Sequence, residues 1–510
     1  MNKWVVGGFC VLFTLLCLGA SQGEEKPLKA GELYDSAMGL YYQGRYEAAL
    51  GSFTQLIRSF PESQSVSFSV YMIGQCYLAM GRPDEAIQQF TLYLKKYPDG
   101  YRVKEAEKGI GTAREKVVQR KETPPERTVD TVRVSPDAQA GRRRICSQIV
   151  FLEAKNMEEV ERKFKDLKKA GVDTVIVRVF QNRGDRAYRF AHPKHEEGVY
   201  FRTDHAPVVD DLLGPLAEMA HRNGLELFAW MTTRYADYGL DGQWDLRCQS
   251  YNFEKKRMEI ARGLSFFHPQ TLKRLEGLFR DLGRYPIDGI LFQDDLILKH
   301  NEDFSVEAGK AFLKEFGYAP HPDVLYIDPY RSDSGTYYVR GYTDQFWDWV
   351  SWKNRWLMDV AQRCRAAAKA SNPNLKFGLN LYYESVLNRS NGLAWFSQSL
   401  SEALKQDFDY YAVMAYHRQA MRELHLEEKK AIHLMAEVAQ KAVEAVGDPS
   451  KVMMKIQVLD WKTYEAIPTE EIDEILTKIL DQGKVSLAFV PYSDSFSLLP
   501  LKRKWNSAPN

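Results

Sequence analysis

The sequence predicts an α/β chain in which a (β/α)8 TIM-type barrel follows a small N-terminal all-α domain of helical repeats. From Ile145 onward, eight short apolar runs alternate with helical patterns, as in a closed ring of parallel strands with helices outside it. Before it, Leu28 to about Val118 shows helical periodicity only. An open doubly wound sheet is the main alternative, but no glycine-rich phosphate loop follows the first strand, which weakens its dinucleotide-binding form.

The N-terminus predicts a secretory signal peptide over residues 1–22. Lys3 supplies the positive charge, Val5–Leu18 is apolar, and the small residues Gly19–Ser21 precede a polar stretch. The apolar run is short for a membrane span of about 20 residues, so we favour cleavage over a retained anchor. We therefore expect export across the inner membrane, a periplasmic or outer-envelope location, and no membrane span after cleavage.

The composition argues against nucleic acid as the main partner. The chain holds 69 lysine and arginine residues against 68 aspartate and glutamate residues, and 13% of it is aromatic. Such a balance still suits a neutral or weakly charged polymer such as a polysaccharide. Beyond the signal, Cys76, Cys146, Cys248 and Cys364 are too few for a disulfide scaffold, and no zinc-binding spacing occurs. We predict no metal and no cofactor.

Residues 28–119 predict two helical repeats. The segment Gly44–Ala49 returns as Gly81–Ala86, an offset of 81 − 44 = 37 residues, and aromatic residues later in each copy match at the same offset. The pattern resembles the tetratricopeptide repeat, whose period is about 34 residues. Such a module binds or tethers a partner, here an envelope or export protein; a helical spacer explains the pattern equally well. Residues 120–145 read as a linker before a barrel over residues 146–502, and we expect its basic run Arg142–Arg144 to be solvated.

The elements expected in the barrel follow from apolar runs and helical periodicity. The candidate strands are Gln148–Leu152, Asp173–Phe180, Leu225–Met231, Ile287–Gln293, Leu375–Leu381, Phe408–Met414, Val452–Val458 and Val485–Val490. The candidate helices are Met157–Lys169, Val209–Asn223, Pro269–Leu282, Ser305–Phe316, Asp344–Ala370, Trp395–Lys405, Leu426–Val446 and Thr469–Gln482.

The fourth candidate strand carries the strongest signal for chemistry, because its apolar run ends in Asp294 and Asp295. In a parallel barrel, functional side chains lie where strands end and the following loops begin. Neighbouring strand residues point to opposite faces, so we expect one aspartate to face the barrel mouth and the other to brace a loop. Periodicity alone does not choose between them.

The other strand ends are rich in amides, carboxylates and aromatic rings. Aromatic faces and hydrogen-bonding groups suit sugars, and two carboxyl groups flank the scissile bond in glycoside hydrolysis. The second catalytic carboxylate would be Glu384, Asp460 or Asp494. The expected substrate-binding residues are Trp230, Gln293, Asn380, Tyr382, Glu384, Tyr416, His417, Gln457, Asp460, Trp461, Tyr492 and Asp494.

Several segments in consistent order from Gln148 to Pro500 resemble the C-terminal glycoside hydrolase domain of the PgaB family, periplasmic deacetylases and hydrolases of poly-β-1,6-N-acetylglucosamine. They are Val199–Arg202, Leu227–Met231, Ile287–Asp295, Glu302–Ser305, Asn380–Tyr382, Ala394–Gln398, Gln457 with Trp461, and Pro491–Phe496.

The resemblance implies a (β/α)8 hydrolase of the partly deacetylated polymer, with catalytic acids at Asp294 and Asp295. Two departures stand out: Gln293 replaces the family's histidine, and Tyr416–Ala420 replaces a segment in which the family carries proline and glutamate. The repeats stand where the family has its metal-dependent deacetylase domain, so we predict no deacetylase activity and no catalytic metal. The alternatives are a non-catalytic polysaccharide-binding scaffold in export, or a hydrolase of another envelope glycan such as peptidoglycan.

Overall fold

The computed structural model describes residues 30–506 apart from 43–44, 64, 99, 101, 123–141 and 332–336. The expected signal peptide (1–22) and most of the expected linker (120–145) therefore lie outside the described residues. Within the described part of the chain, no helix is both long enough and apolar enough to cross a membrane.

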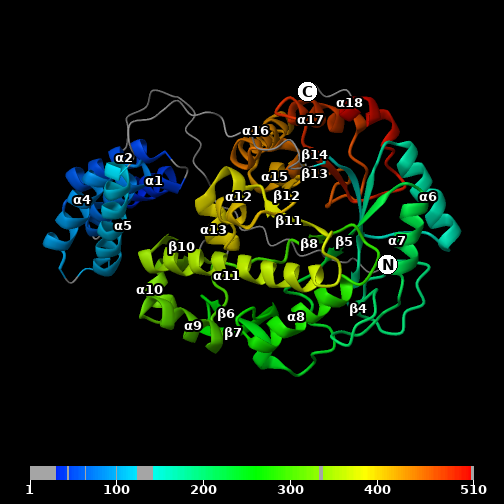
Figure 1. Cartoon of the computed structure of the whole chain (residues 1–510), viewed down its shortest axis with the longest axis horizontal. Helices are drawn as coiled ribbons and strands as arrows, with labels where there is room; N and C mark the ends of the chain where they lie inside the picture. Colours follow the sequence, from blue (N-terminus) through cyan, green and yellow to red (C-terminus); the bar gives the residue numbers. More distant parts are fainter. Residues whose placement is uncertain are drawn as a thin grey trace.

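Eight parallel strands close into a barrel in the order β1-β14-β13-β12-β11-β8-β5-β2, which confirms the predicted fold class (Figure 1). The first strand lies three residues earlier than predicted, because Ile145–Ser147 pair with Leu487–Phe489 of the last strand. The strands are β1 (Ile145–Ile149), β2 (Thr174–Arg178), β5 (Glu226–Met231), β8 (Gly289–Phe292), β11 (Lys376–Tyr382), β12 (Tyr410–Ala415), β13 (Val452–Gln457) and β14 (Ser486–Val490).

Helices surround the barrel, and six of the eight predicted helices begin within two residues of the predicted start (Figure 1). The predicted helix Trp395–Lys405 is wrong: the chain turns at Ser397, which has a φ of 49°, and Gln398 bonds to the backbone of β11 instead of continuing a helix. The helices of the barrel domain are α6 (Met157–Lys169), α7 (Leu213–Arg222), α8 (Pro269–Leu282), α9 (Val306–Phe316), α10 (Pro322–Leu325), α11 (Asp344–Lys369), α12 (Glu384–Leu387), α13 (Arg389–Phe396), α14 (Leu400–Ala403), α15 (His417–Glu423), α16 (Glu428–Val446), α17 (Thr469–Leu480) and α18 (Lys502–Asn506).

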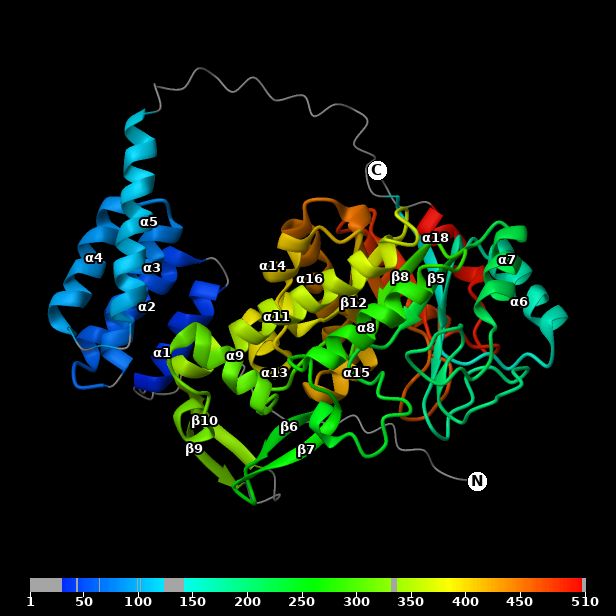
Figure 2. The ribbon, with the colours of Figure 1, turned by 60° about the horizontal axis from the view of Figure 1, so that its bottom comes forward.

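Two β-hairpins that the sequence did not predict follow the third and fourth strands of the barrel. One lies between β5 and α8 in the chain and the other between α10 and α11, and the two lie side by side (Figure 2). Phe253, in the turn of one hairpin, packs against Tyr326 of the other, with ring centroids 4.9 Å apart. The hairpins are β6 (Arg247–Asn252) with β7 (Arg257–Leu264), and β9 (Tyr326–Arg331) with β10 (Tyr337–Tyr342); β3 (Phe180–Gln181) and β4 (Gly198–Val199) form a third pair.

The N-terminal helices form a separate layer beside the barrel (Figure 2). Phe53 and Phe90, which the repeat places at equivalent positions, are both fully buried. A Cβ atom on Gly74 or Gly109 would lie 2.6 Å from the Phe90 ring, so the absence of side chains lets these helices approach. The helices are α1 (Ala30–Tyr42), α2 (Tyr46–Ser59), α3 (Ser65–Ala79), α4 (Pro83–Lys96) and α5 (Val103–Glu122).

Arg144 closes the amino-terminal end of the barrel. Its side chain is 4% exposed, pairs with Glu226, and lies 4.8 Å from the ring centroid of Phe228. Its Nε atom donates to the hydroxyl of Tyr410 on β12, a strand that is not adjacent to β1, so both side chains face the barrel interior. The expectation that the basic run is solvated is therefore wrong at Arg144, because an acid and two aromatic rings surround the guanidinium.

Candidate active site

The inward-facing positions of the barrel follow from one contact across it. Lys455 Nζ on β13 donates a 3.0 Å hydrogen bond to Asn380 Oδ1 on β11, although β12 lies between these strands. Both side chains must therefore point toward the barrel axis. Strand side chains alternate, so Tyr382 and Gln457, two residues further along, belong to the last inward-facing layer at the carboxyl end. We call this layer the mouth.

Asp295 braces a loop. Its side chain is 2% exposed. Its carboxylate accepts bonds from the hydroxyls of Thr232 (2.6 Å) and Thr233 (2.8 Å) and from the backbone N–H groups of Thr233 and Tyr235 (both 2.9 Å). Burial raises the pKa of Asp295, and these four donors act in the opposite direction. Because both oxygens are engaged, this carboxylate ties the loop after β8 to the loop after β5.

Asp294 is partly exposed and lies among groups of the mouth. Its backbone oxygen is 3.4 Å from the hydroxyl of Tyr382. Burial raises the pKa of Tyr382 well above its usual value, and the negative charges of Asp294 and Glu384 add to that rise. Burial likewise raises the pKa of Tyr416, with the charge of Asp294 as the second cause. Asp294 therefore shares one electrostatic environment with two aromatic side chains of the mouth.

Lys455 is a candidate site residue that the sequence analysis missed. It is 2% exposed, and its ammonium lies 5.9 Å from the ring centroid of Tyr416. Burial lowers the pKa of Lys455 to about 8, and the charge of Asp294 opposes this shift. The available signal was a lysine inside the otherwise apolar run Val452–Ile456. A buried lysine needs a partner, and here Asn380 and Asp294 supply a hydrogen bond and an opposite charge.

Glu384 is the second carboxyl group in this environment. It is the first residue of α12, directly after the end of β11. Burial raises the pKa of Glu384 to about 7, and the charge of Glu423 on α15 contributes. Glu423 itself accepts a 3.1 Å hydrogen bond from the hydroxyl of Tyr383. Within the described residues, the buried Oε2 atom of Glu384 has no hydrogen-bond partner.

Among the described residues, several amide groups and one indole group of the mouth also have buried atoms without a hydrogen-bond partner. Buried polar atoms are nearly always hydrogen-bonded in native proteins, so such a group of atoms indicates a surface that binds a polar ligand. Sugar hydroxyls both donate and accept, and they match amide and indole groups. Among the described residues, the buried atoms concerned are Gln148 Oε1, Trp230 Nε1, Gln293 Oε1 and Gln457 Oε1.

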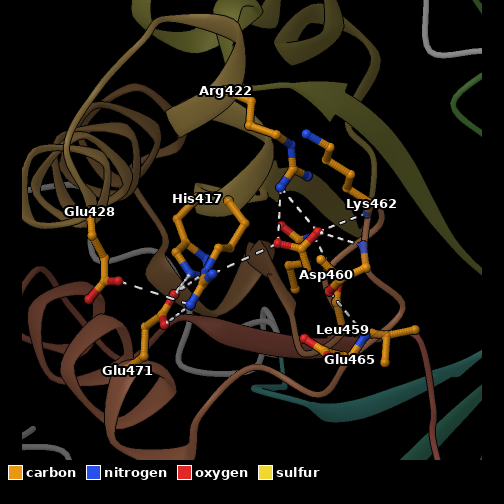
Figure 3. A network of polar contacts seen from close by, with 11 residues as sticks. His417, Arg422, Glu428, Leu459, Asp460, Lys462, Glu465 and Glu471 are labelled. Atoms are coloured by element: carbon orange, nitrogen blue, oxygen red, sulfur yellow. Dashed lines mark hydrogen bonds and ion pairs between the residues drawn. The ribbon is translucent and has the colours of Figure 1, made fainter.

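His417 and Asp460 belong to one ion-pair network, in which Arg418 pairs with both Glu471 and Asp460 (Figure 3). His417 is fully buried, and its Nε2 atom lies 2.5 Å from Glu471 on α17. Asp460 accepts hydrogen bonds from both the side chain of Arg422 (2.9 Å) and the backbone of Lys462 (2.8 Å). Burial raises the pKa of Asp460, but these bonds and the Arg422 charge outweigh it and hold the pKa below its usual value. The contacts of His417 and Asp460 are therefore structural contacts with other side chains and backbone groups of the barrel domain.

Asp494 lies at the outer side of the barrel, over α6. Its carboxylate accepts bonds from Lys163 (2.6 Å) and from the hydroxyl of Tyr492 (2.7 Å). These residues line a pocket of about 440 Å³ between α6 and β14. Trp461, in contrast, packs edge-on against Tyr416, with ring centroids 5.7 Å apart. Of the carboxylates that follow the strands, Asp294 and Glu384 therefore share the surroundings of Tyr382, whereas Asp460 and Asp494 are engaged elsewhere.

Metal ligands do not cluster in the described part of the chain: it holds no group of three or more histidine, cysteine, aspartate or glutamate side chains that could bind a metal ion. The four cysteines Cys76, Cys146, Cys248 and Cys364 are buried and unpaired.

Comparison with known proteins agrees with this architecture. Residues 154–490 match the family described as Hypothetical glycosyl hydrolase family 13 (GHL13), and residues 34–101 match a tetratricopeptide repeat. The PgaB (BpsB) glycoside hydrolase domain from Bordetella bronchiseptica has a TM-score of 0.55 and 21% identity, over 71% of this chain and 99% of that domain. This likeness shows the fold.

Two curated relatives are similar over the same region. The poly-beta-1,6-N-acetyl-D-glucosamine N-deacetylases of Escherichia coli strain K12 and of Escherichia coli O157:H7 are each 24% identical over 341 residues, which is 63% of this chain and 46% of the relative. The chain thus spans about half the length of these relatives. Together the matches confirm the resemblance to the PgaB hydrolase domain and to the tetratricopeptide repeat.

Proposed function

Because the chain belongs to hypothetical glycosyl hydrolase family 13, we propose that it hydrolyses partly deacetylated poly-β-1,6-N-acetylglucosamine by carboxylate acid/base catalysis. The observation that carries the proposal is that Asp294 and Glu384 both lie beside Tyr382 at the carboxyl end of the barrel: the backbone oxygen of Asp294 is 3.4 Å from the Tyr382 hydroxyl, and Glu384 follows Tyr382 by two residues. Hydrolysis of a glycosidic bond needs two carboxyl groups in different protonation states. The surroundings of the two residues differ: Glu384 is buried near a second acid, Glu423, whereas the charge of Asp294 acts on the buried Lys455.

Glu384 is the general acid in this mechanism. With a pKa of about 7, it keeps its proton in a large fraction of molecules at neutral pH. It would protonate the oxygen of the leaving sugar as the glycosidic bond breaks. Asp294, whose charge acts on the buried Lys455 ammonium, supplies the second carboxyl group, which either activates water or attacks the sugar carbon. Asp295 takes no chemical step and holds the loop that carries Asp294.

The charges at the mouth favour an amino sugar. Glu384 and Glu423 are neighbouring acids, and the charge of Glu423 contributes to the raised pKa of Glu384. An ammonium group on a deacetylated glucosamine unit would be attracted by the negative charge of Glu423. The half-buried rings of Tyr382, Tyr416 and Trp461 offer apolar area for sugar rings. The polymer named for the Escherichia coli relatives has this chemistry once deacetylated.

The biological setting is proposed on two grounds, the apolar segment near the N-terminus and the polymer named for the Escherichia coli relatives. We assign the chain to the cell envelope, exported by the segment at residues 1–22, where it would trim an exopolysaccharide of the biofilm matrix. Tetratricopeptide repeats commonly bind other proteins, and residues 34–101 match that repeat. An envelope or export protein is therefore the partner we assign to the helical domain.

Incubation of the purified chain with the partly deacetylated polymer tests this function. We expect oligosaccharides detectable by mass spectrometry, and their loss in the Asp294→Asn variant. Asp494→Asn is the matched control, because that carboxylate pairs with Lys163 at the outer side of the barrel. Wild-type protein that binds the polymer without fragments would instead be a non-catalytic scaffold. Cleavage of peptidoglycan but not of the partly deacetylated polymer would overturn the proposed substrate.

A further inference from the structure

The helical repeats contact the barrel through the start of α11. The hydroxyl of Tyr34 on α1 donates a 2.7 Å hydrogen bond to Asp344, the first residue of α11. Arg102, just before α5, pairs with Asp348 one turn later, with 2.9 Å between Nη1 and Oδ2. Arg102 is 8% exposed, and its guanidinium lies 5.3 Å from the ring centroid of Phe68 on α3. The repeat therefore holds the first two turns of this helix.

The third turn of α11 holds the loop that carries the catalytic carboxylate. Lys353 is fully buried, and its Nζ atom donates to the backbone oxygens of Lys299 (2.8 Å) and Glu302. Both belong to the loop between β8 and α9, which begins with Gln293 and Asp294. A buried ammonium that bonds two carbonyl groups fixes their separation, since neither carbonyl has water as an alternative partner.

The same loop is also held by polar contacts to the residues that follow β5. The carboxylate of Glu302 pairs with Arg234 at 2.8 Å, and their side chains are 7% and 1% exposed. Arg234 lies between Thr233 and Tyr235, whose backbone N–H groups bind Asp295. Arg234 and its neighbours thus hold the loop at two points, Asp295 and Glu302. Polar contacts at Asp348 and at Lys353, joined by the helix backbone between them, therefore connect Arg102 in the repeat with the loop that carries Asp294.

We propose that the helical repeat positions the catalytic loop of the barrel through α11, with Arg102 and Lys353 as positioning residues. This inference rests on the proposed function for its kinetic consequence, but not for its structural one. The helix has 26 residues, and its own buried side chains Trp349 and Trp352 pack against aromatic rings outside the helix: Phe304 stacks on Trp349 and Phe267 on Trp352. It therefore transmits a shift of its first turns as a rigid rod, whereas a flexible segment would absorb it.

Hydrogen exchange tests the structural consequence without any substrate. In the full chain, Arg102→Ala removes the charge that faces Asp344 and Asp348. We expect exchange of amides 296–304 to accelerate by roughly tenfold, although the substitution is in the other domain. Arg82→Ala is the matched control: Arg82 pairs with Glu85 and Glu47 inside the repeat and leaves the barrel untouched. Equal exchange in the two variants would overturn the proposal.

Kinetics on the cleaved polymer adds a second readout. Arg102→Ala should lower kcat by about 5- to 50-fold with KM within about twofold, because misplacement of a reacting group lowers the rate more than the binding. Arg102→Lys should restore part of kcat, and Lys353→Met should lower it as well. The double variant Arg102→Ala/Lys353→Met should lose less than the product of the single losses. Multiplicative losses would show independent effects and overturn the link. If the wild type cleaves no polymer, the proposed function fails while the exchange result still decides the positioning role.

Discussion

Lys455 and Asn380 meet inside the barrel, with 3.0 Å between the ammonium nitrogen and the amide oxygen. The amide nitrogen of Asn380 donates a 2.9 Å hydrogen bond to the backbone oxygen of Phe292, the last residue of β8. Lys455 is thus connected by one side chain to the point where the loop to Asp294 begins. The Lys455–Asn380 pair fixes the direction in which the chain leaves β8. The ammonium of Lys455 also provides a positive charge near the carboxylate of Asp294.

Replacement of Lys455 by methionine should lower kcat by about 10²-fold, the usual effect of removing one electrostatic group from an active site. It should also change the pH dependence of stability. The pKa of Lys455 is lowered to about 8 in the folded protein, so the unfolded chain binds more protons between about pH 8 and 10. Wild-type stability should rise over that range as the burial penalty disappears. Denaturant unfolding from pH 7 to 10 should show a smaller rise in Lys455→Met; equal slopes would contradict the assignment.

The two adjacent aspartates should respond differently to substitution. Asp295→Asn replaces a carboxylate that accepts bonds from four donor groups, and we expect it to lower the free energy of unfolding by about 3 kcal/mol. Asp294→Asn should change stability by less than about 0.5 kcal/mol while lowering kcat by about 10²–10⁴-fold. Urea unfolding and steady-state kinetics on both variants check this. The reverse pattern would exchange the roles of the two residues.

Glu384 should set the alkaline limb of the pH–rate profile. A general acid must carry a proton, and the pKa of Glu384 is about 7, so kcat/KM should fall as the pH rises through 7. Glu384→Gln cannot ionise and should abolish that limb together with most of the rate. Asp460→Asn is a suitable comparison, because Arg422 and Lys462 already occupy that carboxylate. If kcat/KM still falls near pH 7 in Glu384→Gln, a residue other than Glu384 is the general acid.

Asp344 should make the interface between the repeat and the barrel depend on pH. Burial raises the pKa of Asp344 to about 6, against the opposing effects of Tyr34 and Arg102. A raised folded pKa adds stability that is fully present below about pH 4 and is lost as the pH rises through 6. Thermal unfolding between pH 4 and 7 should therefore show a steeper loss in wild type than in Asp344→Asn. Identical profiles would contradict the shift.

The barrel could be predicted because each of its strands is a short apolar run buried on both faces. β14, for example, is buried at all five positions from Ser486 to Val490. The ends of elements were less predictable where a polar residue serves the interior. The sequence predicts Arg144 on the surface and Gln398 in a helix. In the structure, Arg144 fills the amino-terminal end of the barrel, and Gln398 bonds to β11. Their partners are distant in the chain, so no local pattern reveals them.

The site could be predicted in part for the same reason. The end of β8 identified the aspartate pair, but the partners that bind Asp295 lie about 60 residues earlier and decide its role. His417, Asp460 and Asp494 follow strands as site residues do, yet each is engaged by Glu471, Arg422 or Lys163 from a remote helix. Lys455 was overlooked because charged residues inside apolar runs are usually assigned to the solvent side of a strand.

The four donors around Asp295 also limit which amino acids the protein can tolerate at position 295. A library randomised at position 295 and screened for soluble protein should return mostly aspartate, because a longer or neutral residue leaves buried N–H groups unmatched. The same screen at position 294 should return many residues, and only a screen for turnover would narrow them. Homologues that have become inactive while remaining folded should therefore differ first at the position equivalent to 294.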